Sequence, residues 1–353
     1  NFDPEILTYL NESIREEIVD LLDIKQLATN ASELDVDDAV DVIEDLEESD
    51  QEAFLDNLPE SERKLIEEGL NYPEDSAGRL MQRKFVSVSD EWNVGEAIDF
   101  LRTNKKKLPE DFYEIYLTNK DNKISGIVPL GRLMGSNRII KLENIKHKIT
   151  RTVNVFTDQE EVAYQFNKYA MVSAPVVNEN NEIIGSVTVD DVVDVIEEER
   201  EEDILKLGGV GQADIYDAVI DTTKSRFSWL LVNLMTAIIA SIVIGFFQAS
   251  IEKVVALAVL MPIVASMGGN AGTQTLTVSV RALAMKELTA SNAFKIVSKE
   301  TFVGGINGFI FALIIGLLSA YWFEDTLLGF VIALAMILNL MIAGLAGTLI
   351  PLT

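Results

Sequence analysis

The sequence has no cysteine, and among its 353 residues it has a single histidine, His147. Without cysteine, disulfides, zinc–thiolate sites and cysteine nucleophiles are excluded. One isolated histidine cannot form the HExxH zinc motif of metalloproteases, and we find no phosphate-binding loop. These absences argue against an enzyme.

Basic residues are also scarce, with 29 Lys and Arg against 56 Asp and Glu, which gives a net charge of −27. The imbalance lies before Arg226, where 51 acidic residues accompany 23 basic ones, whereas the remainder is nearly neutral. Nucleic acid as a partner is therefore excluded, because phosphates require basic contacts. Two explanations stay open: a solvated surface that keeps the protein soluble, or a surface that binds cations.

The first 199 residues divide into two patterns. Residues 1–72 space apolar residues at three and four positions, as in ESERKLIEEGL, which predicts short amphipathic helices with acidic faces. After the linker-like NYPEDSAG, residues 79–199 contain one α/β unit twice. KISGIVPLGRLM aligns with EIIGSVTVDDVV through Gly126 and Gly185. The order β-α-β-β-α, used twice, predicts two small sheets related by pseudo-symmetry.

Four apolar segments, about 227–247, 254–280, 302–323 and 327–349, are long enough to cross a bilayer. The connections before the first and after the second segment carry the basic residues, whereas the other two connections do not carry a basic excess. Because basic loops stay inside, the acidic N-terminal part is expected in the cytoplasm of a multi-pass plasma-membrane protein.

The second apolar segment contains MPIVASMGGNAGTQTLTV, in which glycines, Pro262 and several amide and hydroxyl residues interrupt the apolar pattern. We expect these interruptions to free backbone carbonyls along a permeation path, since irregular backbone is tolerated only where protein or water covers it. Close helix–helix packing is the alternative, because small residues let backbones approach. Asn339, in the fourth segment, is a weaker polar candidate.

The stretch VDDVVDVIEEEREEDILKL, residues 189–207, carries nine carboxylates and two basic residues. Helical spacing places four acids on one face: Asp191, Asp194, Glu198 and Glu202. DDAVDVIE, residues 37–44, nearly repeats DDVVDVIE, residues 190–197. Two such surfaces repel each other when bare and could close on a hard divalent cation, Mg²⁺ or Ca²⁺. A solvated acidic face is the alternative.

Together these stretches resemble the MgtE family of magnesium channels and transporters. The resemblance covers the whole chain through YPEDSAGRLM, TDQEEVAYQFNKYAMVSAPVV, IIGSVTVDDVVDVIEEE, EEDILKLGGV and PIVASMGGNAGTQT followed by VRALA. It implies a multidomain membrane protein with an acidic all-α N domain (1–72), a tandem CBS pair (73–140 and 141–199), a connecting or plug helix (200–225) and an α-helical transmembrane bundle (226–353).

The resemblance also implies a homodimer in the lipid bilayer that takes up Mg²⁺ and is closed by cytoplasmic Mg²⁺. Its regulatory metal candidates are Asp158, Glu160, Asp191, Asp194, Glu198, Glu199, Glu202 and Asp203, with Asp38 and Asp41 in the N domain. Its pore-lining candidates are Gly269, Asn270, Thr273 and Gln274. ATP at the CBS pair is a further expectation, without assigned residues.

This sequence departs from the family pattern in three respects. Ala170 stands where the family has Asp, the N domain is shorter at its start, and four of five expected spans are present. Two alternative functions remain open from the residues. One is a channel for Mn²⁺, Co²⁺ or Ca²⁺, and the other is a membrane-anchored sensor of adenine nucleotides.

Overall fold

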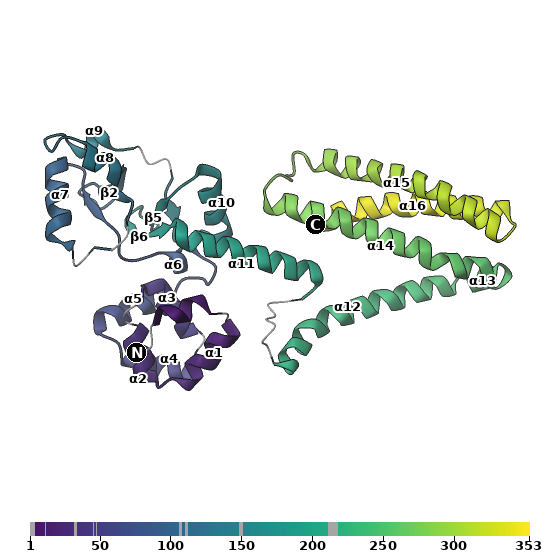
Figure 1. Cartoon of the computed structure of the whole chain (residues 1–353), viewed down its shortest axis with the longest axis horizontal. Coiled ribbons are helices and arrows are strands. Elements are labelled where there is room, and N and C mark those ends of the chain that lie inside the picture. The colour runs from purple at the N-terminus through teal and green to yellow at the C-terminus, as the bar shows by residue number, and fades with distance from the viewer. Residues whose placement is uncertain are drawn as a thin grey trace. The chain divides into compact units, whose positions relative to one another are not determined.

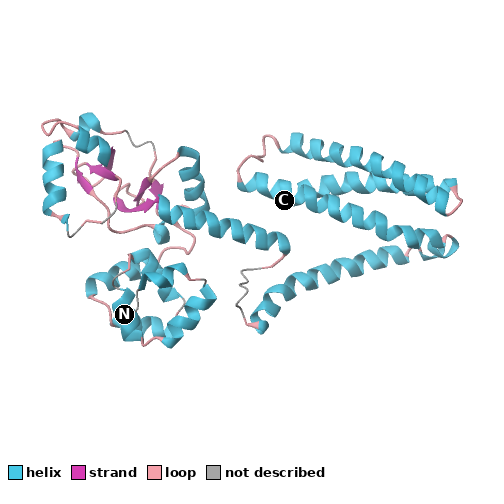
Figure 2. Ribbon diagram, viewed as in Figure 1, coloured by secondary structure: helices cyan, strands magenta, loops and turns pink. Residues whose placement is uncertain are grey.

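The computed structural model describes residues 4–10, 12–31, 34–44, 46, 48–105, 108–109, 112–147, 151–210 and 218–353. The chain divides into two compact units, Asn1–Arg226 and Phe227–Thr353. Figures 1 and 2 show that the first unit contains all the strands and that the second is helical.

The N-terminal part of the first unit is all helical. Its elements are η1 (Pro4–Tyr9), α1 (Glu12–Leu21), α2 (Ile24–Ala31), α3 (Val36–Glu44), α4 (Glu48–Asp56) and α5 (Glu60–Leu70). Phe54, Leu27 and Ile43 lie fully buried in one shared core. Helix α3 turns Val40 and Ile43 into that core, and because apolar and acidic residues alternate at helical spacing, its aspartates lie on the other side.

Two three-stranded sheets follow, and the repeat predicted from sequence is confirmed. The first half contains α6 (Ala77–Leu80), β1 (Ser87–Ser89), α7 (Val94–Thr103), β2 (Glu114–Thr118), β3 (Ile124–Pro129), α8 (Leu130–Gly135) and α9 (Leu142–Ile145). The second contains β4 (Val153–Asn154), α10 (Gln159–Tyr169), β5 (Ser173–Val177), β6 (Ile183–Thr188) and α11 (Val189–Gly208). In each sheet a parallel pair precedes an antiparallel one.

The aligned glycines occupy equivalent places in the two sheets. Gly126 pairs with Leu117 and Gly185 pairs with Val176. A Cβ at Gly126 would meet the side chain of Lys146, and one at Gly185 would meet Met81. Each glycine thus makes room for the chain segment that leads into the other half, which explains why the repeat keeps it.

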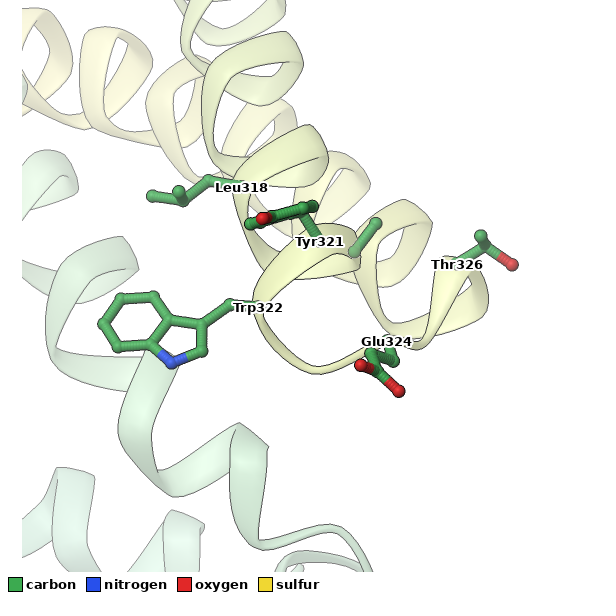
Figure 3. A pocket seen from close by; sticks show the side chains of 6 residues that line it. Leu318, Tyr321, Trp322, Glu324 and Thr326 are labelled. Atoms are coloured by element: carbon green, nitrogen blue, oxygen red, sulfur yellow. The ribbon is translucent and has the colours of Figure 1, made fainter.

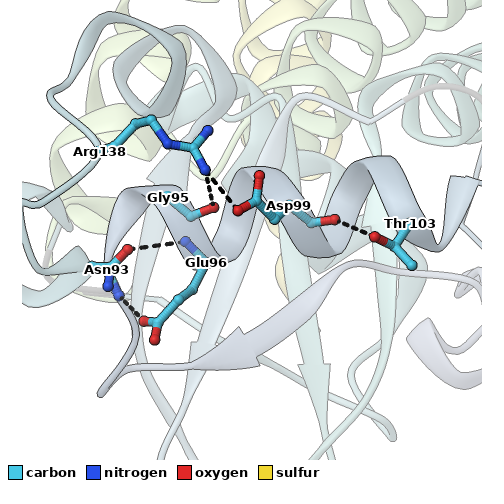
Figure 4. Close-up of polar contacts among 6 residues, drawn as sticks. All are labelled: Asn93, Gly95, Glu96, Asp99, Thr103 and Arg138. Carbon is cyan, nitrogen blue, oxygen red and sulfur yellow. Dashed lines mark hydrogen bonds and ion pairs between the residues drawn. The ribbon is translucent and has the colours of Figure 1, made fainter.

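Helix α7 shows how local sequence fixes an element. Asn93 accepts a hydrogen bond from the amide of Glu96, and the Glu96 carboxylate accepts one from the amide of Asn93 (Figure 4). This capping box satisfies two donors that the first helical turn would otherwise leave unpaired. Arg138 pairs with Asp99 on α7 at 2.6 Å. This exposed ion pair joins the later part of the first half to the helix.

Helix α11 ends at Gly208, and Gly209 adopts a left-handed φ of 66°. Glycine reaches this conformation without a Cβ penalty. Helix α11 begins at Val189 with the second α/β half, so the segment 200–225 starts inside this helix and contains its end. Residues 211–217 lie outside the described part, and the bounds of the connecting segment stay a prediction.

The second unit contains the four predicted spans, which are helices long and apolar enough to cross a membrane. They belong to α12 (Val219–Gly245), α14 (Val255–Ala284), α15 (Ala293–Trp322) and α16 (Thr326–Leu349), with α13 (Gln248–Lys253) between the first two and η3 (Ile350–Leu352) last. Helices α14, α15 and α16 pack together around Met336 and Leu340. No residue of 222–245 in α12 is buried against the described chain.

The expectation that α14 is interrupted is wrong, because the helix is continuous from Val255 to Ala284 with Pro262 inside it. A proline removes one amide donor and need not end a helix where neighbouring helices support it. The packing alternative is confirmed for Gly268, where a Cβ would overlap the side chain of Asn339. Asn339 itself donates to the carbonyl of Val264 at 2.6 Å, joining α16 to α14.

Adjacent glycines on α15 offer a matched test of this close packing. A Cβ at Gly304 would overlap the backbone carbonyl of Leu340 on α16, whereas one at Gly305 would lie 3.4 Å from the flexible side chain of Met341. We expect Gly304→Ala to lower the stability of the detergent-solubilised protein by about 1–3 kcal/mol, since the backbone must move to make room. Gly305→Ala should leave the thermal unfolding midpoint nearly unchanged, and equal midpoints for both would contradict this packing.

Candidate metal centre

Helix α3 presents a row of three aspartates, Asp37, Asp38 and Asp41, whose pKa values are raised chiefly by burial. Burial raises the pKa of Asp37 well above its ordinary value, and that of Asp38 to about 7. The Oδ1 atom of Asp37 is buried and has no hydrogen-bond partner. An unpaired buried carboxylate oxygen is costly, so this atom is suited to a cation.

Helix α11 supplies the opposing acids, and its first turn is fixed by local bonds. Asp191 accepts a hydrogen bond from the Thr188 hydroxyl at 2.6 Å and others from the Gln82 amide at 3.3 Å. These donors lower the pKa of Asp191, but burial has the larger effect and raises it to about 6. Burial and neighbouring carboxylates also raise the pKa of Asp194 and Glu198.

The two rows act on each other across the boundary between the helical part and the α/β part. After burial, the charge of Asp191 helps raise the pKa of Asp37 and of Asp38. Burial raises the pKa of Asp41 to about 6; Glu198 adds to the rise, whereas Arg15 and Arg79 oppose it. The near-repeat of residues 37–44 and 190–197 thus brings like charges together, as predicted.

A second acidic group forms where α10 begins. Asp158 caps this helix by accepting from the amide of Glu160, and Gln159 donates to Glu199 on α11 at 3.1 Å. Burial raises the pKa of Glu199, and the charges of Glu160, Glu202 and Asp158 contribute. Glu202 also pairs with Lys206. Asp203 lies one turn before Lys206 and acts on its pKa.

Within the described ranges, no three acidic or histidine side chains converge tightly enough to hold a metal ion directly. The donor chemistry nevertheless fits a hard cation, because carboxylate oxygens are the ligands of Mg²⁺ and Ca²⁺. Mg²⁺ keeps several of its waters, so ligands spread more widely than direct coordination distance remain compatible with it. Asp37, Asp38 and Asp191 are the residues that would hold the ion.

In the second unit, the polar candidates of α14 share one face. Gly269, Asn270, Thr273 and Gln274 are exposed, whereas the opposite face, with Gly268, Thr275 and Ser279, is buried. Spacing of three and four residues explains this division. Polar side chains are expensive in lipid and normally face a protein interior or a watery path.

A shallow, open pocket of about 730 Å³ lies at the turn from α15 to α16 (Figure 3). It is lined by Leu318, Ala320, Tyr321, Trp322, Glu324 and Thr326. The rings of Tyr321 and Trp322 end the third span, a position that aromatic residues commonly take at membrane interfaces. This pocket therefore marks a span end.

Three family models match the chain in succession. The intracellular N domain of MgtE matches residues 1–75, CBS domains match 77–136 and 144–198, and the MgtE divalent cation transporter domain matches 261–353. The magnesium transporter MgtE of Bacillus subtilis is 31% identical over 321 residues, which are 91% of this chain and 71% of the relative. This chain belongs to the MgtE family.

Two other comparisons agree. The magnesium transporter MgtE of Thermus thermophilus is 32% identical over 323 residues, 90% of this chain and 71% of the relative. The crystal structure of the cytosolic domain of the Mg²⁺ channel MgtE in complex with ATP is similar with a TM-score of 0.51 and 31% identity, over 54% of this chain and 78% of that one. The chain is therefore a member of a family of membrane transport proteins for magnesium.

Sequence reasoning missed several residues of this MgtE site. Asp37 was overlooked although it precedes Asp38 in the repeated DDAVDVIE motif, which was the available signal. Gln82 and Arg79 gave no periodic signal, because they lie just after the linker-like NYPEDSAG and only the fold brings them to the acids. Ala170, the departure from the family pattern, ends α10 with a left-handed φ of 50°.

The raised carboxylate pKa values predict that bound protons can replace the metal ion in neutralising these acids. Because Asp38, Asp41 and Asp191 bind protons more tightly when docked than when exposed, docking of α3 against α11 should weaken as pH rises from about 4 to about 7. Fluorescence transfer between labels at Leu21→Cys and Ile139→Cys, both exposed sites in this cysteine-free chain, should report it. Metal-free protein that docks more tightly at pH 8 than at pH 5 would contradict the sign.

Proposed function

We propose that the protein is a Mg²⁺ channel for Mg²⁺ uptake that is closed by Mg²⁺ bound between the acids of α3 and α11. The observation that carries this proposal is the buried, unpartnered Oδ1 of Asp37, which lies among other acids whose pKa values are raised. Such a group needs a counter-ion when it is charged. A bound divalent ion supplies two positive charges to opposing carboxylates and thereby holds the two rows together.

Loss of the ion restores the repulsion, so the N domain separates from α11 when cytoplasmic Mg²⁺ is low. The free energy for this change comes from the difference in Mg²⁺ affinity between the closed and open states. The second acidic group, with Asp158, Glu160, Glu199 and Glu202, would bind a further ion along the same helix. Asp203, which follows it, is kept as a candidate by family resemblance.

The permeation path is proposed along the exposed polar face of α14. Gly269, Asn270, Thr273 and Gln274 would line it, and Mg²⁺ would pass largely hydrated because it loses water reluctantly. A second copy of the chain would cover this face, since polar residues do not face lipid at low cost. An inside-negative potential would favour entry by about 2.3 kcal/mol per charge per 100 mV.

The cytoplasm is the proposed location of the first unit, and the plasma membrane that of the second. Basic residues at Lys224 and Arg226 and between α14 and α15 support this orientation. ATP is proposed to bind the CBS pair, where Arg151, Lys168 and Tyr169 line a cavity of about 390 Å³. Cationic groups suit phosphates, and a tyrosine ring suits a base.

Removal of two sensor acids should keep the channel open at millimolar Mg²⁺. In proteoliposomes containing the full-length protein, Asp38→Asn with Asp191→Asn should raise the Mg²⁺ concentration for half-closure by roughly 10–100-fold, the range usual when support for a metal is lost. Asp121→Asn, in an exposed turn of the first CBS motif, is the matched control. Unaltered closure in the double variant would refute this regulatory site. Ion selectivity is measured in the same proteoliposomes, where a flux of Mn²⁺, Co²⁺ or Ca²⁺ that exceeds the Mg²⁺ flux would favour a channel for one of those ions.

The pore assignment has a separate test on α14. Asn270→Leu places an apolar side chain on the proposed path, so we expect Mg²⁺ flux to fall by at least tenfold while the assembled protein is retained. Leu313→Ala, on an exposed apolar part of α15, is expected to conduct normally. Full flux through the Asn270 variant would exclude this face as the path.

A further inference from the structure

The start of the first CBS motif, directly after the N domain, is hydrogen-bonded into the second CBS motif. Ala77 and Gly78 donate backbone hydrogen bonds to the carbonyls of Thr157 and Val155, at 2.7 and 2.8 Å. Further along, Gln82 and Ser186 exchange two backbone hydrogen bonds. Residues 76–84, which we call the strap, are therefore a fixed edge of the CBS pair.

Three basic side chains project from this strap onto the N domain. Arg79 pairs with Glu44, the last residue of α3, at 2.5 Å, and Lys84 pairs with Asp35, just before α3, at 3.2 Å. Cations on the strap thus hold α3 at both of its ends. The middle of α3 carries the aspartates that oppose α11.

Arg83 provides a third point of attachment, on α5. Its guanidinium lies 3.8 Å from the carboxylate of Glu68 and 5.6 Å from the centre of the Tyr72 ring. Only 9% of its side chain is exposed. The strap therefore contacts two helices of the N domain.

The exposure of these pairs indicates which one matters most. Lys84 and Asp35 are both half-exposed or more, and exposed pairs contribute little. The Arg79 side chain is only 11% exposed, and its Nε also donates to the carbonyl of Tyr72 at 3.1 Å. Arg83 is buried as deeply, but its pair with Glu68 is longer, at 3.8 Å, and Glu68 is nearly half exposed. Breaking the closer Arg79–Glu44 pair leaves a mostly buried, uncompensated charge, which is strongly unfavourable, so Arg79 contributes most.

We propose that the strap is a metal-independent latch, in which Arg79 with Glu44, assisted by Arg83 and Lys84, favours docking of the N domain on the CBS pair beside α11. The proposal rests on the proposed closure by Mg²⁺ and adds a set of contacts that favour docking without binding the ion. When the ion leaves, these contacts oppose the repulsion between the acids but do not outweigh it, so the N domain still separates. Arg79 is thus a positioning residue for the regulatory site.

A latch of this kind determines how much Mg²⁺ the closure requires. Because these ion pairs lower the free-energy cost of docking, less of that cost has to be supplied by Mg²⁺ binding. Without the latch, the same ion would have to supply all of it. The Mg²⁺ concentration at which the protein closes therefore depends on residues that do not bind the ion.

The labelled pair Leu21→Cys and Ile139→Cys tests the latch in the full chain. We expect Arg79→Gln to reduce fluorescence transfer in metal-free protein and to raise the Mg²⁺ midpoint for docking by about tenfold or more, since loss of one partner of a buried charge pair is costly. Glu44→Gln, which leaves the strap intact, should act in the same direction. Arg138→Gln breaks a similar pair with Asp99 inside the first CBS motif (Figure 4) and should titrate like the parent.

A charge exchange separates pairing from folding. Arg79→Glu alone should undock the domain, and combination with Glu44→Arg should restore at least part of the metal-free transfer. Circular dichroism identifies any variant that is unfolded, in which case the Glu44→Gln titration decides. Parent-like midpoints for both Arg79→Gln and Glu44→Gln would overturn the latch.

Failure of the latch and failure of Mg²⁺ closure give different results. If the parent responds to Mg²⁺ and the latch variants match it, the latch is wrong and the closure stands. If the parent stays docked at every Mg²⁺ concentration while the variants undock, the latch stands and the closure is wrong.

Discussion

The arrangement of the first unit depends on like charges held against each other. Asp37 and Asp38 of α3 lie within electrostatic range of Asp191 on α11, and burial makes their charged forms more costly. A protein can keep such groups only if protons, metal ions or basic side chains compensate them. Basic side chains contact both ends of α3, the raised pKa values favour protons on its aspartates, and the proposed function adds a metal ion.

The basic residues show how that compensation is divided. Arg79 and Lys84 pair with carboxylates at the two ends of α3, whereas the aspartates in the middle of the helix are the ones proposed to bind a cation. The CBS pair contributes the rigid frame, since the strap and α11 both extend from its second sheet. Under the proposed function, transport and regulation would use separate groups: amides and hydroxyls in the membrane helices, and carboxylates in the first unit.

Much of the fold and part of the candidate site could be predicted from the sequence. The period of three and four in residues 1–72, the repeated β-α-β-β-α unit and four long apolar segments each reflect local physical constraints that do not need distant contacts. The motifs around YPEDSAGRLM and GGNAGTQT indicated the family. The near-identity of residues 37–44 and 190–197 also indicated that the two acidic helices belong together. The repulsion between them in the absence of a cation follows from charge and spacing alone.

Only the tertiary structure decided which residues meet. It made α14 a continuous helix, because its glycines serve contact with α16 and a proline costs only one amide donor there. It also attached the strap to the second sheet, which placed Arg79 against Glu44 across 35 positions of sequence. Periodicity reports which face of a helix is apolar, but it carries no information on which charged group from a distant segment will lie opposite, since that depends on how whole domains pack.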